Sequence, residues 1–168
     1  MTFRQSIITC LRKYFTFSGR ASRSEYWWFF LFNILGGLFF SALEGFINGI
    51  TGTPDGPTLL SGAFNLAIFI PGLAVGFRRM HDTGRSGVYL FYPMIAIVGL
   101  LTFIGFVGGV EALEAGNPLA MMEGALGIIT GIAIIVVALS PFIVLFWLTR
   151  PSQPGQNQYG PNPTEVHP

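Results

Sequence analysis

The sequence predicts an all-α membrane protein with four transmembrane helices. Charged residues make up 10% of its 168 residues, whereas about 25% is usual in soluble domains. The mean hydropathy is +0.59, and four continuous apolar stretches approach or exceed the roughly 20 residues needed to cross a hydrocarbon core. These stretches do not alternate between apolar and polar residues, which argues against a transmembrane β-barrel.

Short polar segments separate the four predicted spans. The first apolar stretch is longer than the core of a secretory signal and leads into no small-residue cleavage site, so we expect it to remain as an anchor. The predicted organisation is a cytoplasmic segment over residues 1–25, a four-helix bundle over 26–150 and a Pro/Gly-rich tail over 151–168. The predicted spans are Tyr26–Ile50, Leu59–Phe77, Val88–Val110 and Leu126–Leu148.

The basic residues predict how the spans are oriented. All nine Lys and Arg residues fall before the first span, between the second and third spans, or after the fourth. Short segments rich in Lys and Arg stay in the cytoplasm, so both termini are predicted to be cytoplasmic. The acidic residues predicted to lie outside are Asp55, Glu111, Glu114 and Glu123.

The segment before the first span predicts an amphipathic helix and a helix cap. Apolar residues recur at helical spacing over residues 3–15, which indicates a helix that lies at the cytoplasmic interface or packs on the bundle. Ser22 and Glu25 fit a capping box at the start of the first span. Trp27, within an aromatic run, is predicted to anchor that span at headgroup depth.

Three prolines and an asparagine occupy similar depths in the predicted spans. Pro71, Pro93 and Pro141 lie about 8 to 11 Å inside the cytoplasmic boundary, and Asn33 reaches a comparable depth. Proline frees a backbone carbonyl in a helix, so this layer is consistent with a hollow that opens to the cytoplasm. The alternative is that the prolines only let the helices curve around one another. A hollow would suit a small channel or transporter subunit.

Glycine pairs at four-residue spacing occur in every predicted span. Such pairs let helix backbones approach closely, and they favour tight bundling or self-association without distinguishing between them. The expected partners are therefore the lipid bilayer and, through these small-residue faces, a second copy of the chain. The pairs are Gly45 and Gly49, Gly72 and Gly76, Gly105 and Gly109, and Gly127 and Gly131.

The densest group of polar residues lies in two predicted cytoplasmic segments. Guanidinium groups suit bidentate contacts with phosphate, so the leading hypothesis is a non-enzymatic protein that binds an anionic lipid headgroup or a phosphate-bearing ligand. The alternative is a topology signal in which Asp82 neutralises one arginine. The candidate ligand-binding residues are Arg20, Arg23, Arg78, Arg79, His81, Asp82 and Arg85, with a turn predicted at Gly84.

Composition gives little support to other functions. The single cysteine excludes an internal disulfide and a CxxC pair, and two histidines are too few for a His-based zinc site. We therefore expect no metal and no cofactor. A net charge of +1 argues against nucleic-acid binding. A membrane enzyme that uses His81 and Asp82 is the third hypothesis, but no nucleophile motif accompanies them and no catalytic residue is assigned.

Three strings together resemble a known family. They are FSGRASRSEYW from residue 17, RRMHDTGRSG from residue 78 and PGQNQYGPNP from residue 154. Their order and placement resemble the bacterial inner-membrane family catalogued as domain of unknown function 805. The resemblance implies a multi-span inner-membrane protein with these motifs in the cytoplasm, and it assigns no activity. It also implies an ordered tail, with Tyr159 largely buried beside residues 78–82, although the tail's composition favours irregular chain.

Overall fold

The described part of each apolar stretch is helical. The computed structural model describes residues 1–53, 56–106, 116 and 124–165. No strand occurs among these residues, so the predicted all-α fold is confirmed. The helices are α1 (Phe3–Arg12), α2 (Arg23–Thr51), α3 (Leu59–Asp82), the 3-10 helix η1 (Gly87–Phe91), α4 (Tyr92–Phe106) and α6 (Gly124–Thr149).

Four helical segments are long and apolar enough to cross a membrane. They are α2, α3, η1 joined to α4, and α6, which confirms the four predicted spans. The cytoplasmic placement of both termini stays a prediction. Several predicted features lie outside the described residues, namely Asp55, Gly109, the predicted end of the third span at Val110, Glu111, Glu114 and Glu123.

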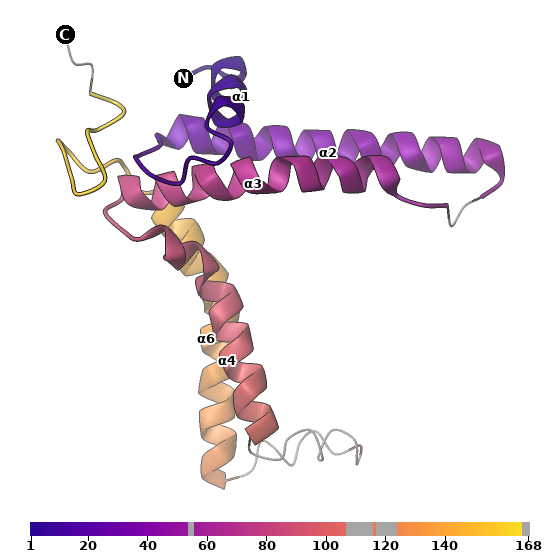
Figure 1. Ribbon diagram of the computed structural model, residues 1–168. Coiled ribbons are helices and arrows are strands. Elements are labelled where there is room, and N and C mark those ends of the chain that lie inside the picture. Colours follow the sequence, from indigo (N-terminus) through magenta and orange to yellow (C-terminus); the bar gives the residue numbers. More distant parts are fainter. Residues whose placement is uncertain (54–55, 107–115, 117–123, 166–168) are drawn as a thin grey trace. The chain divides into compact units, whose positions relative to one another are not determined.

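The described chain forms two compact units. The first contains Met1–Gly87 and Arg150–Pro168, and the second contains Val88–Thr149. In the first unit, α2 and α3 run antiparallel and α1 lies across them near one end (Figure 1). In the second unit, α4 and α6 form an antiparallel pair in which Trp147 packs against aromatic residues of η1 and α4. A single bundle of all four spans stays a prediction.

Helix α3 continues past the end predicted from hydropathy. We expected the span to end at Phe77 and residues 78–82 to form a loop, but α3 ends at Asp82. The charged side chains of this last part find partners inside the protein, so the helix does not have to stop where its apolar run stops. Gly84 then adopts a φ of +76°, a conformation that glycine allows without strain, and the chain turns.

Close packing between α2 and α3 depends on one glycine. Phe64 of α3 lies over Gly36 of α2, with ring contacts to Phe32 at 5.9 Å and Phe40 at 5.1 Å between centroids. A Cβ on Gly36 would overlap the Phe64 ring. No such close contact occurs at five of the glycines that were selected by their four-residue spacing. A Cβ would meet nothing within 4 Å in the described chain at Gly45, Gly49, Gly72, Gly105 and Gly131.

The carbonyl that Pro71 frees in α3 is already satisfied. Proline lacks the N–H that would bond the carbonyl four residues earlier, and that carbonyl belongs to Ala67. The Tyr14 hydroxyl donates to it at 2.6 Å.

Asn33 lines a pocket of about 180 Å³ between α2 and α3 whose other walls are mostly apolar.

In the second unit, Pro141 frees the carbonyl of Val137, and the Ser140 hydroxyl donates to it at 2.7 Å. Pro93 is the second residue of α4, where a missing N–H costs no helical bond. The predicted hollow therefore has no open backbone acceptor at Pro71 or Pro141. A layer shared by all three prolines and Asn33 stays a prediction, because these residues belong to different units.

The predicted capping box at the start of α2 is half formed. The Ser22 side chain accepts a hydrogen bond from the Glu25 amide at 3.2 Å, as predicted. The Glu25 carboxylate does not return to the Ser22 amide and instead binds Arg78 of α3 at 2.5 Å. A carboxylate forms a stronger, charge-assisted hydrogen bond with a guanidinium than with a backbone amide. Glu25 therefore joins two helices and does not complete the cap.

Candidate functional site: an ion-pair network beside an arginine pocket

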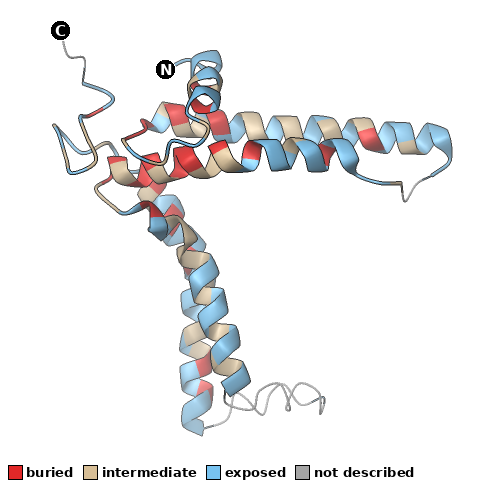
Figure 2. Ribbon diagram, viewed as in Figure 1, coloured by how far each residue is buried: buried red, intermediate tan, exposed pale blue. Residues whose placement is uncertain are grey.

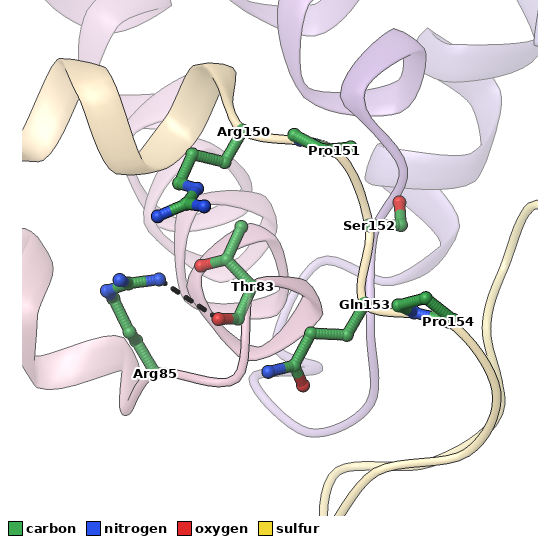
Figure 3. A pocket seen from close by; sticks show the side chains of 7 residues that line it. All are labelled: Thr83, Arg85, Arg150, Pro151, Ser152, Gln153 and Pro154. Carbon is green, nitrogen blue, oxygen red and sulfur yellow. Dashed lines mark hydrogen bonds between the residues drawn. The ribbon is translucent and has the colours of Figure 1, made fainter.

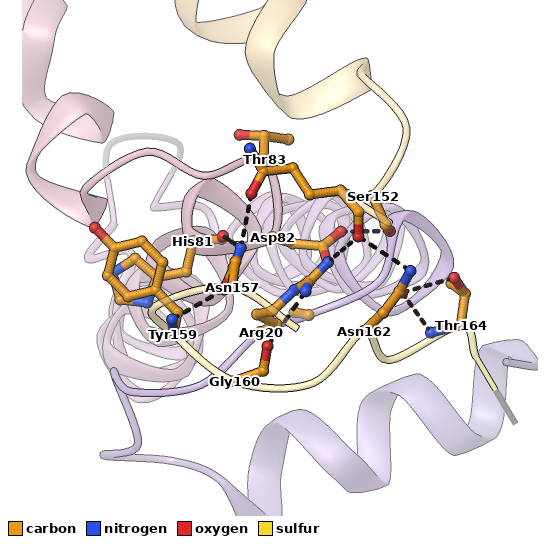
Figure 4. Close-up of polar contacts among 12 residues, drawn as sticks. Arg20, His81, Asp82, Thr83, Ser152, Asn157, Tyr159, Gly160, Asn162 and Thr164 are labelled. Carbon is orange, nitrogen blue, oxygen red and sulfur yellow. Dashed lines mark hydrogen bonds and ion pairs between the residues drawn. The ribbon is translucent and has the colours of Figure 1, made fainter. Parts of the chain in front are cut away.

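Buried residues concentrate where α1 crosses the α2–α3 pair (Figure 2). Asp82, the last residue of α3, is at the centre of this region. It accepts from Arg20 Nε at 2.9 Å and from Ser152 Oγ at 2.5 Å (Figure 4). It also accepts from Arg79 Nη1. Asp82 and Arg79 are completely buried and Arg20 is 6% exposed. One buried carboxylate therefore pairs with two buried guanidinium groups.

Other donors of these guanidinium groups bind the tail and Arg150, the residue before it. Arg20 donates to the carbonyl of Gln153 at 2.6 Å and to that of Gly155 at 2.7 Å, and Arg79 Nη2 donates to the Arg150 carbonyl. The Gln153 amide donates back to the Asp82 carbonyl at 3.0 Å. We call Arg20, Arg79, Asp82 and these tail partners the latch. It joins the segment before α2, the end of α3 and the tail.

A second contact holds the tail beside the latch. The Tyr159 ring stacks on the His81 imidazole, with centroids 3.9 Å apart and planes 2° apart. Asn157 Nδ2 donates to the His81 carbonyl at 3.0 Å, and Asn157 Oδ1 accepts from the Tyr159 amide at 2.9 Å. Tyr159 is half-buried, less than expected, because His81 covers one face of its ring.

Arg78 lies in a different buried cluster. It pairs with Glu25, and the Cys10 thiol of α1 lies 3.9 Å from the same carboxylate. Burial, followed by the charge of Glu25, raises the pKa of the Cys10 thiol to about 12. Cys10 therefore stays a neutral thiol near pH 7, which suits packing and not nucleophilic chemistry.

The structure thus separates the residues predicted to form one basic site. Arg20, Arg78 and Arg79 are buried in internal ion pairs and do not form an open surface for an external anion. Arg23 is exposed and lines a pocket of about 400 Å³ with Ser152. Arg85 lines a further pocket, together with Arg150 and residues of the tail.

That pocket has a volume of about 290 Å³ and is open to the surface (Figure 3). Arg85 and Arg150 approach it from the turn after α3 and from the end of α6, and Arg85 Nη1 donates to the Thr83 carbonyl at 3.0 Å. No acidic side chain is among the described residues that line it. The lining residues are Thr83, Arg85, Arg150, Pro151, Ser152, Gln153 and Pro154.

Sequence reasoning missed Arg150 as a site residue and used it only for orientation. Its position directly before the tail motif was the available signal, because the latch returns the tail to the end of α3. His81 and Asp82 are adjacent in sequence but bind different partners, Tyr159 and the two guanidinium groups. Among the described residues, no group of three or more His, Cys, Asp or Glu side chains could hold a metal ion.

Comparison with known proteins gives one family. The family model described as "Protein of unknown function (DUF805)" matches residues 14–161. Inner membrane protein YhaH of Escherichia coli strain K12 is 37% identical over 110 residues, which cover 64% of this chain and 84% of that protein. Inner membrane protein YhaI of the same strain is 37% identical over 116 residues, which cover 67% of this chain and 93% of that protein. No solved structure matches the chain.

Proposed function

We propose, from the premise that this chain belongs to the DUF805 family of inner-membrane proteins of unknown function, that it binds a phosphate-bearing anion in the pocket between Arg85 and Arg150. The protein is then a membrane protein that binds this anion and catalyses no reaction. The anion is the headgroup of an anionic lipid or a small phosphorylated compound, since both present the same phosphate oxygens.

The observation that carries this proposal is that two arginines line one open pocket together. Arg85 and Arg150 line one cavity of about 290 Å³, and no described carboxylate lines it with them. Guanidinium groups match phosphate oxygens with parallel N–H donors. Gln153 adds a side-chain amide to the same wall. Arg20, Arg78 and Arg79 do not compete for the ligand on this proposal, because they are buried in ion pairs with Asp82 and Glu25.

The two alternative functions have weaker support. A channel or transporter subunit needs a polar path through the spans, but the carbonyls freed by Pro71 and Pro141 are bonded to Tyr14 and Ser140. An enzyme that uses His81 needs an accessible imidazole, whereas this ring is stacked on Tyr159.

Replacing Arg85 or Arg150 with glutamine is expected to weaken phosphate binding about tenfold or more for each change, since a charged hydrogen bond contributes about 1.5 to 3 kcal/mol. The measurement is the thermal stabilisation of detergent-solubilised protein by three probes: short-chain phosphatidylglycerol, short-chain phosphatidylcholine and glycerol phosphate. Phosphatidylglycerol should stabilise more than phosphatidylcholine, and salt should reduce the effect. A response to glycerol phosphate would identify a soluble ligand as sufficient.

Arg23→Gln is the matched control, because it removes one exposed arginine that lines a different pocket. It should leave the response to phosphatidylglycerol almost unchanged. The proposal is wrong if all three variants respond alike, or if neither phosphatidylglycerol nor glycerol phosphate stabilises the unmodified protein more than phosphatidylcholine does.

A further inference from the structure

Helix α1 has a small, polar buried side and an apolar exposed side. Ser6 and Cys10 are completely buried against the first unit. Ile8 and Leu11 of α1, and Phe15 in the turn that follows α1, are 39%, 42% and 75% exposed. An apolar stripe turned away from the protein needs an apolar partner.

The N-terminal half of α1 is fixed to the first turns of α2. The Ser6 hydroxyl donates to the Ser24 carbonyl at 3.3 Å, and the Phe3 ring meets Trp28 edge-on at 5.8 Å. These α2 residues belong to the start of a membrane span, where aromatic side chains sit at headgroup depth. This end of α1 therefore lies level with the membrane interface.

The chain that follows α1 reaches further along the span. The Tyr14 hydroxyl donates to the Ala67 carbonyl of α3, which lies about 16 Å along the helix from Arg78 at 1.5 Å per residue. The chain then returns to Asp82 through Arg20. An extended chain from Tyr14 to Arg20 spans about 20 Å, close to the roughly 22 Å between Ala67 and Asp82 along α3.

We propose that α1 is embedded in one leaflet of the membrane, with its apolar stripe among the acyl chains and its C-terminal end deeper than its N-terminal end. The carbonyl that Tyr14 binds is well inside the apolar part of α3, so a position above the headgroups does not fit this contact. Arg4 and Arg12 of α1 and its C-cap residue Lys13 are exposed. Long basic side chains of this kind extend to lipid phosphates while their stems stay in the apolar layer.

The test places nitroxide labels on cysteines introduced at Leu11 and Phe15 in a Cys10→Ala protein, reconstituted in vesicles of phosphatidylcholine and phosphatidylglycerol. Gln158, an exposed tail residue, is the control site. Power saturation with oxygen and with a water-soluble nickel chelate reports whether each label contacts lipid or water. Labels at 11 and 15 should have an oxygen-to-nickel accessibility ratio several-fold higher than the label at 158, and a label at Phe3 should be shallower than one at Phe15.

A second measurement avoids the cysteine changes. A benzophenone side chain at position 15 of the otherwise unmodified chain should crosslink to phospholipid under light. Two results would overturn the proposal. In one, nickel reaches the label at Phe15 as readily as the label at Gln158; in the other, neither reagent reaches Phe15 and the benzophenone crosslinks to protein.

Discussion

Replacing Asp82 with asparagine is expected to destabilise the protein by about 3 to 5 kcal/mol and to release its tail. Removing one partner of a buried ion pair leaves the other charge uncompensated at that cost, and here two guanidinium groups lose the same carboxylate. Asparagine would also turn an N–H₂ donor toward groups that are themselves donors. Arg20 would keep its tail carbonyls but would lose the group that orients it.

The loss is measured as the free energy of reversible unfolding in mixed micelles, together with limited proteolysis of the tail. Glu165→Gln is the matched control, because it makes the same chemical change at an exposed tail carboxylate. Its remaining oxygen can still accept from the Gly155 amide, so its effect should stay within about 0.5 kcal/mol. If the two variants unfold alike and Asp82→Asn keeps its tail protected, Asp82 does not hold the latch together.

Replacing Gly36 with alanine is expected to separate α2 and α3 locally, at a cost of about 1 to 3 kcal/mol. The added methyl group would overlap the Phe64 ring, which Phe32 and Phe40 hold on both sides. The ring cannot give way without moving those neighbours, so the backbones must move apart.

Gly37 provides an unusually close control. A Cβ there would lie 3.7 Å from Asn65 Oδ1, an ordinary contact. Both changes add the same methyl group to the same helix, so the difference between the two unfolding free energies isolates the clash with Phe64. Gly37→Ala should be neutral or slightly stabilising. Equal stability of the two variants would show that α2 and α3 do not approach at Gly36.

Hydropathy predicted the four spans well because a membrane imposes length and apolarity on each helix. The three strings also pointed to the correct family. The end of α3 was missed because hydropathy treats Arg78 as a stop, whereas a buried arginine with a carboxylate partner continues a helix. Glu25 shows the same difficulty. Its spacing from Ser22 indicated a cap, but its stronger partner is distant in the sequence.

The sequence predicted which types of residue gather at the site, but it did not predict how they are arranged. The sequence shows how many arginines gather near the spans, but it does not show which of them meet a carboxylate. Asp82 was expected to offset one arginine, and it binds both Arg20 and Arg79. Arg150 could not be predicted as a pocket residue from the sequence, because it lies near Arg85 only through the contact of the tail with the end of α3.

The tail is part of the folded protein and completes the latch. Hydrogen exchange of the tail amides in the 168-residue protein tests this most directly. The amides of Gln153, Asn157 and Gly160 bond to carbonyls in the structure, and that of Tyr159 bonds to the Asn157 side chain. All four should therefore exchange far more slowly than in a free peptide of the same sequence. Exchange at the rate of the free peptide would contradict the account.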